Sequence, residues 1–134
     1  QIPGLNFSFS GLKTSILYFV RDRVREDPEF IQKNLDDICA SVQHRIVTIL
    51  LNKVRRAARE YGISQIAIAG GVSANSGLRQ TFADAAAKYG WRLFIPKFEY
   101  CTDNAAMIAV AGYYKFLKKD FIGQDAAPLA RMPI

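Results

Sequence analysis

Apolar residues in the first half of the chain recur every three or four positions, which is the spacing of one helix face. One such stripe predicts a helix over residues 10–26, begun by a serine cap at Ser10 and ended at Asp27-Pro28. A second stripe predicts a longer helix over residues 29–61, and Gly62 is the residue type that ends helices. The apolar positions of the two stripes are Leu12, Ile16, Phe19, Val20 and Val24, then Leu35, Ile38, Cys39, Val42, Ile46, Ile49, Leu50 and Val54.

The second half of the chain alternates short apolar runs with helical patterns. The runs over residues 65–69 and 91–95 have the length of buried strands, and helices are predicted over residues 74–89 and 103–117. Strands joined by a helix pair in parallel with a right-handed crossover. The pattern therefore predicts an α/β fold with a βαβα core, preceded by two helices and by a brief strand over residues 6–9.

The predicted sheet is small. Two strands are too few for a stable open sheet, so we expect further strands from outside this chain. The exposed sheet edge also predicts dimerisation, because a second copy can pair with it. Residues 118–134 show no periodicity and are predicted to form an irregular tail of a single domain over residues 1–134. The chain begins at Gln1 without an initiator methionine, and we expect it to be a piece of a longer protein.

The composition indicates an ordinary folded domain with a positive charge. The 134 residues (15.0 kDa) are half hydrophobic, and the formal net charge of +6 favours polyanions such as nucleic acid. The alternative is that much of this charge is simply solvated helix surface. Two cysteines without metal-ligand spacing, and no secretory signal, predict a reducing, cytoplasmic setting. The longest apolar runs fall far below the ~20 residues that span a bilayer, so we expect no membrane segment.

A glycine pair marks the end of the first predicted strand. Gly70 and Gly71 follow the apolar run and precede the next helical pattern. A helix that begins after paired glycines offers backbone N–H groups and the positive end of its dipole to an anion, and bare backbone lets a phosphate approach closely. The pair therefore predicts a nucleotide-binding turn, although a purely structural turn has the same pattern. Asn75 is predicted either to cap the helix or to bind the base or ribose of that nucleotide.

Asp103 stands at the corresponding junction after the second predicted strand. Because ligands gather at the carboxyl ends of parallel strands, we expect Asp103 to lie near Gly70. Its carboxylate is suited either to cap the last helix or to bind a divalent metal, but one carboxylate cannot hold an ion alone. The nearby Cys101 is interpreted as a packing residue rather than as a nucleophile activated by His44, the only histidine.

Basic residues gather near the end of the long predicted helix, at Lys53, Arg55, Arg56 and Arg59. Cations at a helix C-terminus are stabilised by the helix dipole, which is the simpler interpretation of this cluster. The alternative is contact with the phosphates of an RNA backbone.

Three blocks of sequence occur together in this chain: FSFSGLKT at residues 7–14, GGVSAN followed by LR within residues 70–79, and CTDNAAMIA at residues 101–109. In this order and spacing they resemble the C-terminal half of the tRNA N6-adenosine threonylcarbamoyltransferase family, whose older name is O-sialoglycoprotein endopeptidase or glycoprotease. The resemblance covers roughly residues 5–117.

The resemblance implies part of an actin-like, sugar-kinase or Hsp70-type ATPase lobe. It implies transfer of threonylcarbamoyl from threonylcarbamoyl-AMP to N6 of the adenosine next to the anticodon in tRNA, with companion subunits of the transfer complex as partners. On the matching positions, Gly70 and Gly71 border the phosphate of the adenylate or an ATP-like nucleotide. Asn75 contacts the adenylate, and Asp103 is a ligand of an iron or zinc-like divalent metal. The block from Ser10 to Lys13 is a family signature to which chemistry assigns no role.

The paired metal-binding histidines of the family belong to a first lobe that this chain does not include. We therefore expect weak metal binding and an inactive isolated chain, because half of the walls that orient the reactants are missing. Two other interpretations stay open: a lobe of another actin-fold ATPase or sugar kinase, and a non-catalytic module that binds RNA or protein. The Cys-Thr-Asp-Asn block argues against a kinase, and no metalloprotease helix supports the older protease name.

Overall fold

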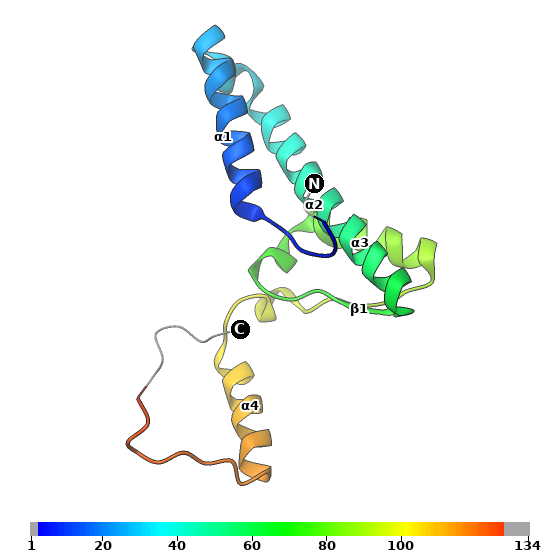
Figure 1. The fold of residues 1–134 in the computed structure, drawn as a ribbon, viewed down its shortest axis with the longest axis vertical. Coiled ribbons are helices and arrows are strands. Elements are labelled where there is room, and N and C mark those ends of the chain that lie inside the picture. Colours follow the sequence, from blue (N-terminus) through cyan, green and yellow to red (C-terminus); the bar gives the residue numbers. More distant parts are fainter. Residues whose placement is uncertain (1–2, 128–134) are drawn as a thin grey trace. The chain divides into compact units, whose positions relative to one another are not determined.

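The structure is a computed structural model that describes residues 3–127. The chain divides after Cys101 into two compact units. Figure 1 follows the order of the elements from the N-terminus to the C-terminus. The expectation of one domain over residues 1–134 stays a prediction, and residues 128–134 of the expected tail lie outside the described residues.

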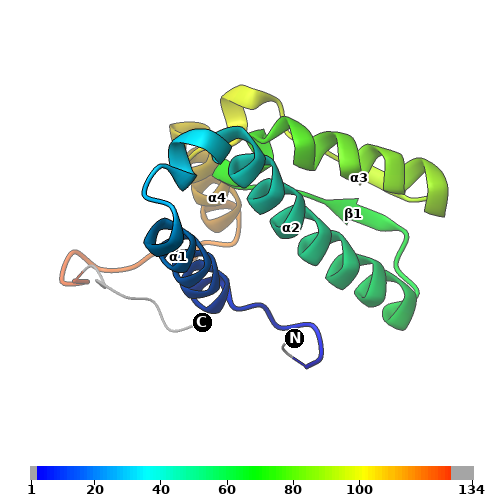
Figure 2. The same cartoon turned by 90° about the horizontal axis from the view of Figure 1, so that it is seen from above.

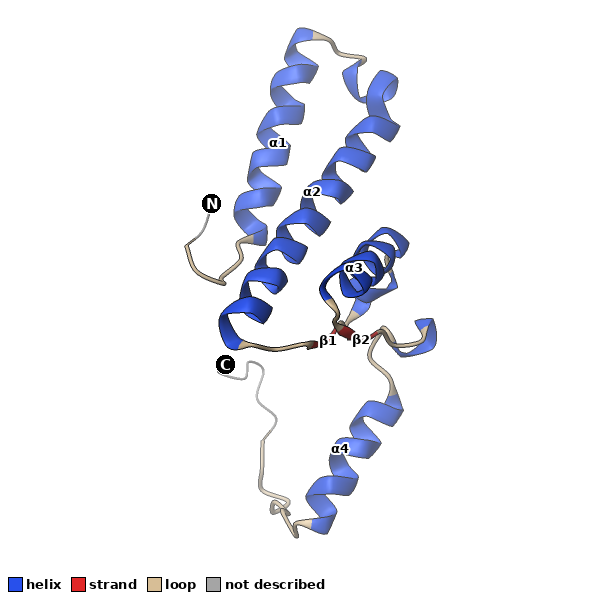
Figure 3. Ribbon diagram, turned by 90° about the vertical axis from the view of Figure 1, so that its right-hand side faces the viewer, coloured by secondary structure: helices blue, strands red, loops and turns tan. Residues whose placement is uncertain are grey.

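The first two helices form an antiparallel hairpin. α1 (Phe9–Glu26) and α2 (Phe30–Tyr61) lie side by side along most of the length of α1 (Figures 1 and 3). In the turn between them, the carboxylate of Asp27 accepts hydrogen bonds from Lys33 Nζ and from the backbone N–H of Glu29, each at 3.0 Å. The hydrogen bond from Lys33 is the largest cause of a lowered pKa for Asp27, and the bond from the Glu29 amide is the next, because both stabilise the charged form of the carboxylate.

The ends of the hairpin helices follow local rules, with one correction. The predicted serine cap exists, but it is Ser8 and not Ser10: Ser8 Oγ accepts a hydrogen bond from the backbone N–H of Gly11 at 3.1 Å. The predicted strand over residues 6–9 is wrong, because Ser8 is extended only as a helix cap and the next residue already belongs to α1. α2 ends as predicted at Gly62, whose φ of 64° lies in the left-handed region that glycine adopts without strain.

The parallel βαβ unit is confirmed. β1 (Gln65–Ala67) and β2 (Arg92–Phe94) pair in parallel with Ile66 opposite Leu93, and α3 (Ser76–Tyr89) connects them. Each strand has three residues, fewer than the five predicted. β2 ends shortly before Pro96, which has no N–H to donate to the neighbouring strand, and β1 ends shortly before the glycine turn at Gly70.

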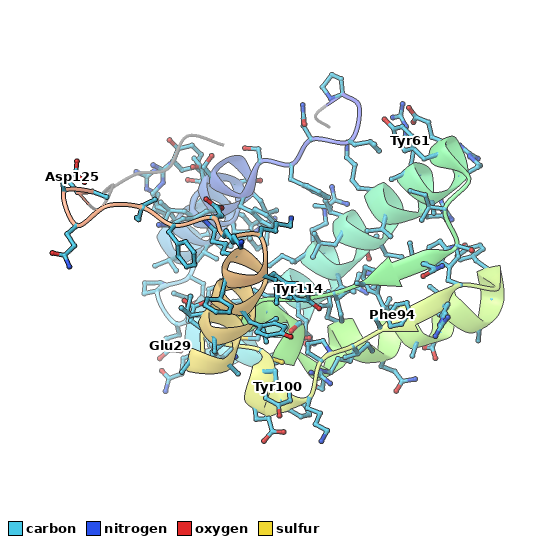
Figure 4. All side chains as sticks on the ribbon, turned by 90° about the horizontal axis from the view of Figure 1, so that it is seen from below. Glu29, Tyr61, Phe94, Tyr100, Tyr114 and Asp125 are labelled. Atoms are coloured by element: carbon cyan, nitrogen blue, oxygen red, sulfur yellow. The ribbon has the colours of Figure 1, made fainter. Side chains whose placement is uncertain are left out.

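The core of the first unit lies between the sheet and two helices. α2 and α3 lie side by side and cover one face of the sheet (Figures 2 and 3). Val47, Leu78 and Phe82 are buried at the centre of this layer, and Phe82 is only 2% exposed. The residues packed around them are Leu50, Leu51, Val54, Ile66, Ile68 and Leu93. Phe94, on the opposite face of the sheet, is 43% exposed (Figure 4).

The described part of the second unit, residues 102–127, contains one helix. α4 (Ala105–Leu117) begins after Asn104, whose Oδ1 accepts a hydrogen bond from the backbone N–H of Met107 at 3.2 Å. Residues 118–127 continue in turns and irregular structure. Among the described residues, no helix combines the length and the apolar character that crossing a membrane requires.

Candidate functional site

The glycine pair forms a bare stretch of backbone where the chain leaves β1. Gly70 has φ 82° and ψ 172°, a conformation that only glycine adopts readily. Gly71 opens a single 3-10 turn, η1 (Gly71–Ala74). Apart from the chain neighbours, no atom of the described residues lies within 4 Å of the place where a Cβ would stand on either glycine. Both glycines are exposed, so the backbone here is open to the close approach of a ligand.

The prediction of a helix directly after the glycine pair is wrong in detail. The short turn η1, which Gly71 itself opens, comes before α3, and α3 begins at Ser76 instead of near residue 74. The amides at the start of η1 have no acceptor within their own turn, as at any helix start. The anion-binding potential of the site therefore comes from one short turn rather than from the dipole of a long helix.

Asn75 is the N-cap of α3, so the capping alternative is confirmed. Its Oδ1 accepts a hydrogen bond from the backbone N–H of Leu78 at 2.8 Å, and its Nδ2 donates to Gln43 Oε1 on α2, also at 2.8 Å. An amide carries two donors and two lone pairs, so one of each remains after these two bonds. Contact with an adenylate by the same side chain stays a prediction.

Gly77 explains how Gln43 reaches the cap. A Cβ on Gly77 would stand 2.9 Å from Gln43 Nε2 and 3.3 Å from Asn75 Oδ1. The missing side chain therefore leaves room for the hydrogen bond that ties α2 to the start of α3. In the sequence, Gly77 is a glycine inside a helical pattern, which is a signal for a packing role.

Arg79 belongs to the second sequence block, but the sequence pattern predicts no role for it in the site. Its Nε donates to the carbonyl of Ser73 at 2.6 Å, and its Nη2 donates to the carbonyl of Pro96 at 2.7 Å. The same Nη2 lies 3.2 Å from Cys101 Sγ, and the guanidinium carbon lies 4.1 Å from the centre of the Phe98 ring. One side chain thus fastens the glycine turn to the segment that follows β2.

Two further side chains of the first unit bear on the candidate chemistry. Cys101 is buried, with its thiol against Arg79 and against the carbonyl of Lys97 at 3.4 Å, while His44 is exposed on α2 beside Thr48. The interpretation of Cys101 as a packing residue is therefore confirmed.

Ser73 lies inside η1 and carries an unusual polar group. It is only 1% exposed, and its Oγ has no hydrogen-bond partner among the described residues. Its carbonyl, by contrast, accepts the Arg79 hydrogen bond, so the backbone of Ser73 is held in place while its hydroxyl is not.

Asp103 lies in the second unit, directly before the cap of α4. Asn104 and not Asp103 caps this helix, so the capping alternative for Asp103 is wrong, and the carboxylate is exposed. Within residues 3–127, no group of three His, Cys, Asp or Glu side chains is arranged to hold a metal ion. Asp103 provides a single carboxylate, and one carboxylate cannot hold a metal ion alone. Its expected proximity to Gly70 stays a prediction.

Comparison with known proteins gives a consistent result. The family model for tRNA N6-adenosine threonylcarbamoyltransferase matches residues 1–110. A protein of that name from Christiangramia forsetii is 63% identical over 121 residues, which are 90% of this chain and 36% of the relative. Proteins of that name from Porphyromonas gingivalis and Cytophaga hutchinsonii are 56% and 55% identical over all 134 residues, which are 39% of each relative.

The chain therefore spans well under half the length of the curated relatives that it matches. The match decides against a sugar kinase or an unrelated binding module as its family. By this match and by identities above 50% over its whole length, the chain belongs to the tRNA N6-adenosine threonylcarbamoyltransferase family.

Proposed function

We propose that this chain is the C-terminal part of an enzyme that transfers threonylcarbamoyl from threonylcarbamoyl-AMP to N6 of the adenosine next to the anticodon in tRNA. The observation that carries the proposal is the 56% identity over all 134 residues to a relative of that name. The exposed, bare-backboned turn at the carboxyl end of β1 supports it, because that is where ligands of parallel α/β sheets bind.

Each candidate residue has a distinct role in this proposal. The backbone at Gly70 and Gly71 borders the phosphate of the adenylate, because no side chain keeps the phosphate at a distance. The donor and the lone pair that remain on the Asn75 side-chain amide form hydrogen bonds with the adenylate. Asp103 provides one carboxylate to a divalent metal, iron or zinc-like, whose other ligands come from outside residues 3–127.

The proposed reaction is an acyl transfer. The N6 amine of adenosine forms a bond to the carbamoyl carbon, the bond from that carbon to the phosphate oxygen breaks, AMP leaves, and the amine loses a proton. Rate enhancement in such a step depends on holding donor and acceptor together, an effect that is worth up to about 7–11 kcal/mol. The chain has only part of the length of its relatives, so we expect it to be inactive alone.

The setting of the enzyme follows from the same family. We propose an actin-like ATPase fold for the whole protein, of which the small parallel sheet and its two covering helices form part. tRNA is the proposed acceptor, companion subunits of the transfer complex are the proposed partners, and the cytoplasm is the proposed location. Pairing of two copies through the open sheet edge is a further proposal.

A chimera tests the proposed function. This chain replaces the matching segment of the Porphyromonas gingivalis relative, and the chimera is assayed with that organism's companion subunits, threonylcarbamoyl-AMP and unmodified tRNA. We expect the modified adenosine to appear in digested tRNA at a rate within about tenfold of the parent enzyme. A chimera that is folded by circular dichroism and still makes no product while the parent does would refute the proposal.

A matched pair of glycine variants tests the role of the turn. Gly70 and Gly62 both have positive φ, and among the described residues neither has a neighbour within 4 Å of an added Cβ, but only Gly70 belongs to the candidate site. We expect Gly70→Ala to lower transfer at least tenfold, while Gly62→Ala keeps most of the activity. Equal losses in the two variants would mean that backbone strain alone, and not phosphate contact, explains the effect.

A further inference from the structure

The strongest unassigned feature of the first unit is a basic, aromatic hollow of about 690 Å³. It lies where the end of α2 meets the turn from α3 into β2. Its lining includes Arg55, Arg56 and Arg59 from α2, together with Tyr89, the last residue of α3, and Trp91, which comes before β2.

The two aromatic rings and one arginine are held together by direct contacts. Arg55 Nη1 donates a hydrogen bond to Tyr89 Oη at 3.2 Å, and the Tyr89 and Trp91 rings lie with their centres 5.1 Å apart. Gly90, between the two aromatic residues, has a φ of 69° and lets the chain turn there without strain. The hydrogen bond from Arg55 is also the main cause of a lowered pKa for Tyr89.

The charge of this hollow is not explained by helix capping. Of the basic residues, only Arg59 lies in the last turn of α2, where the helix dipole acts. Arg56 pairs with Glu60 at 3.6 Å, whereas Arg55 and Arg59 have no ion pair within residues 3–127. The hollow therefore keeps an excess of positive charge, and the simpler dipole interpretation of this cluster accounts for only one of its arginines.

We propose that this hollow binds the substrate RNA, with the arginines on backbone phosphates and an exposed base stacked against Trp91. Guanidinium groups match phosphate geometry, and aromatic rings are the surfaces on which proteins stack unpaired bases. An acidic peptide would match the charge, but it has no nucleic-acid base to stack against the Trp91 ring. This inference rests on the proposed function, since the RNA is the acceptor tRNA of that function.

The hollow is separate from the glycine turn. The turn follows the carboxyl end of β1, whereas Trp91 comes directly before the amino end of β2. In a parallel pair these are opposite ends of the sheet. The hollow therefore anchors a part of the RNA other than the reacting adenosine, and it contributes affinity rather than chemistry.

Trp91 provides the direct test, because it is the only tryptophan in the chain. Unmodified tRNA is titrated into the chain while tryptophan fluorescence is followed at several salt concentrations. Stacking on a base should quench the fluorescence, and Trp91→Leu should weaken binding about 5- to 100-fold by removing the stacked ring. Unchanged fluorescence at saturating tRNA would overturn the proposal.

A charge-matched pair of double variants tests the arginines. Arg55→Gln with Arg59→Gln should weaken tRNA binding about tenfold and reduce the slope of log K against log salt by about 1.4–1.8, the value for two lost phosphate contacts. The control removes two exposed arginines of α1, by Arg21→Gln with Arg25→Gln, and should keep the slope of the unchanged chain. Equal slopes in both double variants would overturn the inference.

The outcomes separate this inference from the proposed function. If the chimera transfers threonylcarbamoyl but the Arg55 and Arg59 variant binds tRNA normally, the hollow is not the RNA site and the proposed function stands. If the chain binds tRNA through the hollow while the chimera makes no product, the proposed transfer activity is refuted and the proposed RNA site is supported.

Discussion

The clamp made by Arg79 allows the sharpest prediction about this structure. Replacing it by methionine keeps most of the side-chain length but removes every hydrogen bond of the guanidinium. The carbonyls of Ser73 and Pro96 then lose their charged donor, and the Phe98 ring loses the cation above it. The glycine turn and the segment after β2 should separate as a result.

The size of the loss follows from the contacts. Two hydrogen bonds from a charged donor contribute about 1.5 kcal/mol each, and a cation–π contact at a half-exposed site adds about 0.5–1 kcal/mol. Because Arg79 is only half-buried and the contacts share one side chain, water and coupling reduce the sum. We expect Arg79→Met to lower the free energy of unfolding by about 2–3 kcal/mol.

Urea unfolding and thiol reactivity measure this effect independently. Cys101 is 2% exposed beside Arg79, whereas Cys39 is exposed, so Cys39→Ser provides a background in which a thiol reagent reports on Cys101 alone. In that background, Arg79→Met should make the Cys101 thiol react at least tenfold faster. With Arg79→Lys, the Cys101 thiol should react at a rate between those found with Arg79 and with Arg79→Met, because a single ammonium cannot reproduce the two-pronged geometry of the guanidinium.

Arg92 supplies the matched control for the clamp. Its guanidinium lies 5.0 Å from the centre of the exposed Phe94 ring, so Arg92→Met removes a cation–π contact without removing a clamp. This variant should change the free energy of unfolding by no more than about 0.5 kcal/mol. An Arg79→Met variant as stable as the Arg92 control, with Cys101 still protected, would refute the clamp.

Three further predictions concern single groups. Ser73→Ala should leave the free energy of unfolding unchanged or raise it by up to about 1 kcal/mol in urea titration, because the buried hydroxyl has no partner among residues 3–127; a clear loss would reveal one. Arg55→Gln should raise the pKa of Tyr89 toward its ordinary value, followed by NMR of labelled tyrosine; an unchanged pKa would contradict the hydrogen bond between them. Lys33 and a backbone amide lower the pKa of Asp27, so its contribution to stability is complete above its ordinary pKa of 3.8 and is lost as pH falls through the lower folded value. The stability difference between the unchanged chain and Asp27→Asn should therefore shrink on acidification, and a difference that grows would contradict this.

The sequence by itself determined the features that depend on neighbours along the chain. The apolar stripes of α1 and α2, the stop at Gly62, and the order of β1, α3 and β2 are local patterns, and each was predicted close to its observed position. The family assignment has the same origin, because it depends on blocks of adjacent residues. Local rules succeed here because helix periodicity and helix ends depend on residues within about one turn.

Tertiary structure decided which side chains complete the site. The Arg79 acceptors lie 6 and 17 residues away, and the bond from Asn75 to Gln43 spans 32 residues. Backbone geometry, which neighbouring residues in the sequence do not specify, also decided two local features. These are the choice of Asn104 over Asp103 as the cap of α4 and the short turn η1 before α3. Packing of α2 and α3 against the sheet brings these distant groups together, because burial of Phe82 and its neighbours fixes the positions of the segments to which the groups belong.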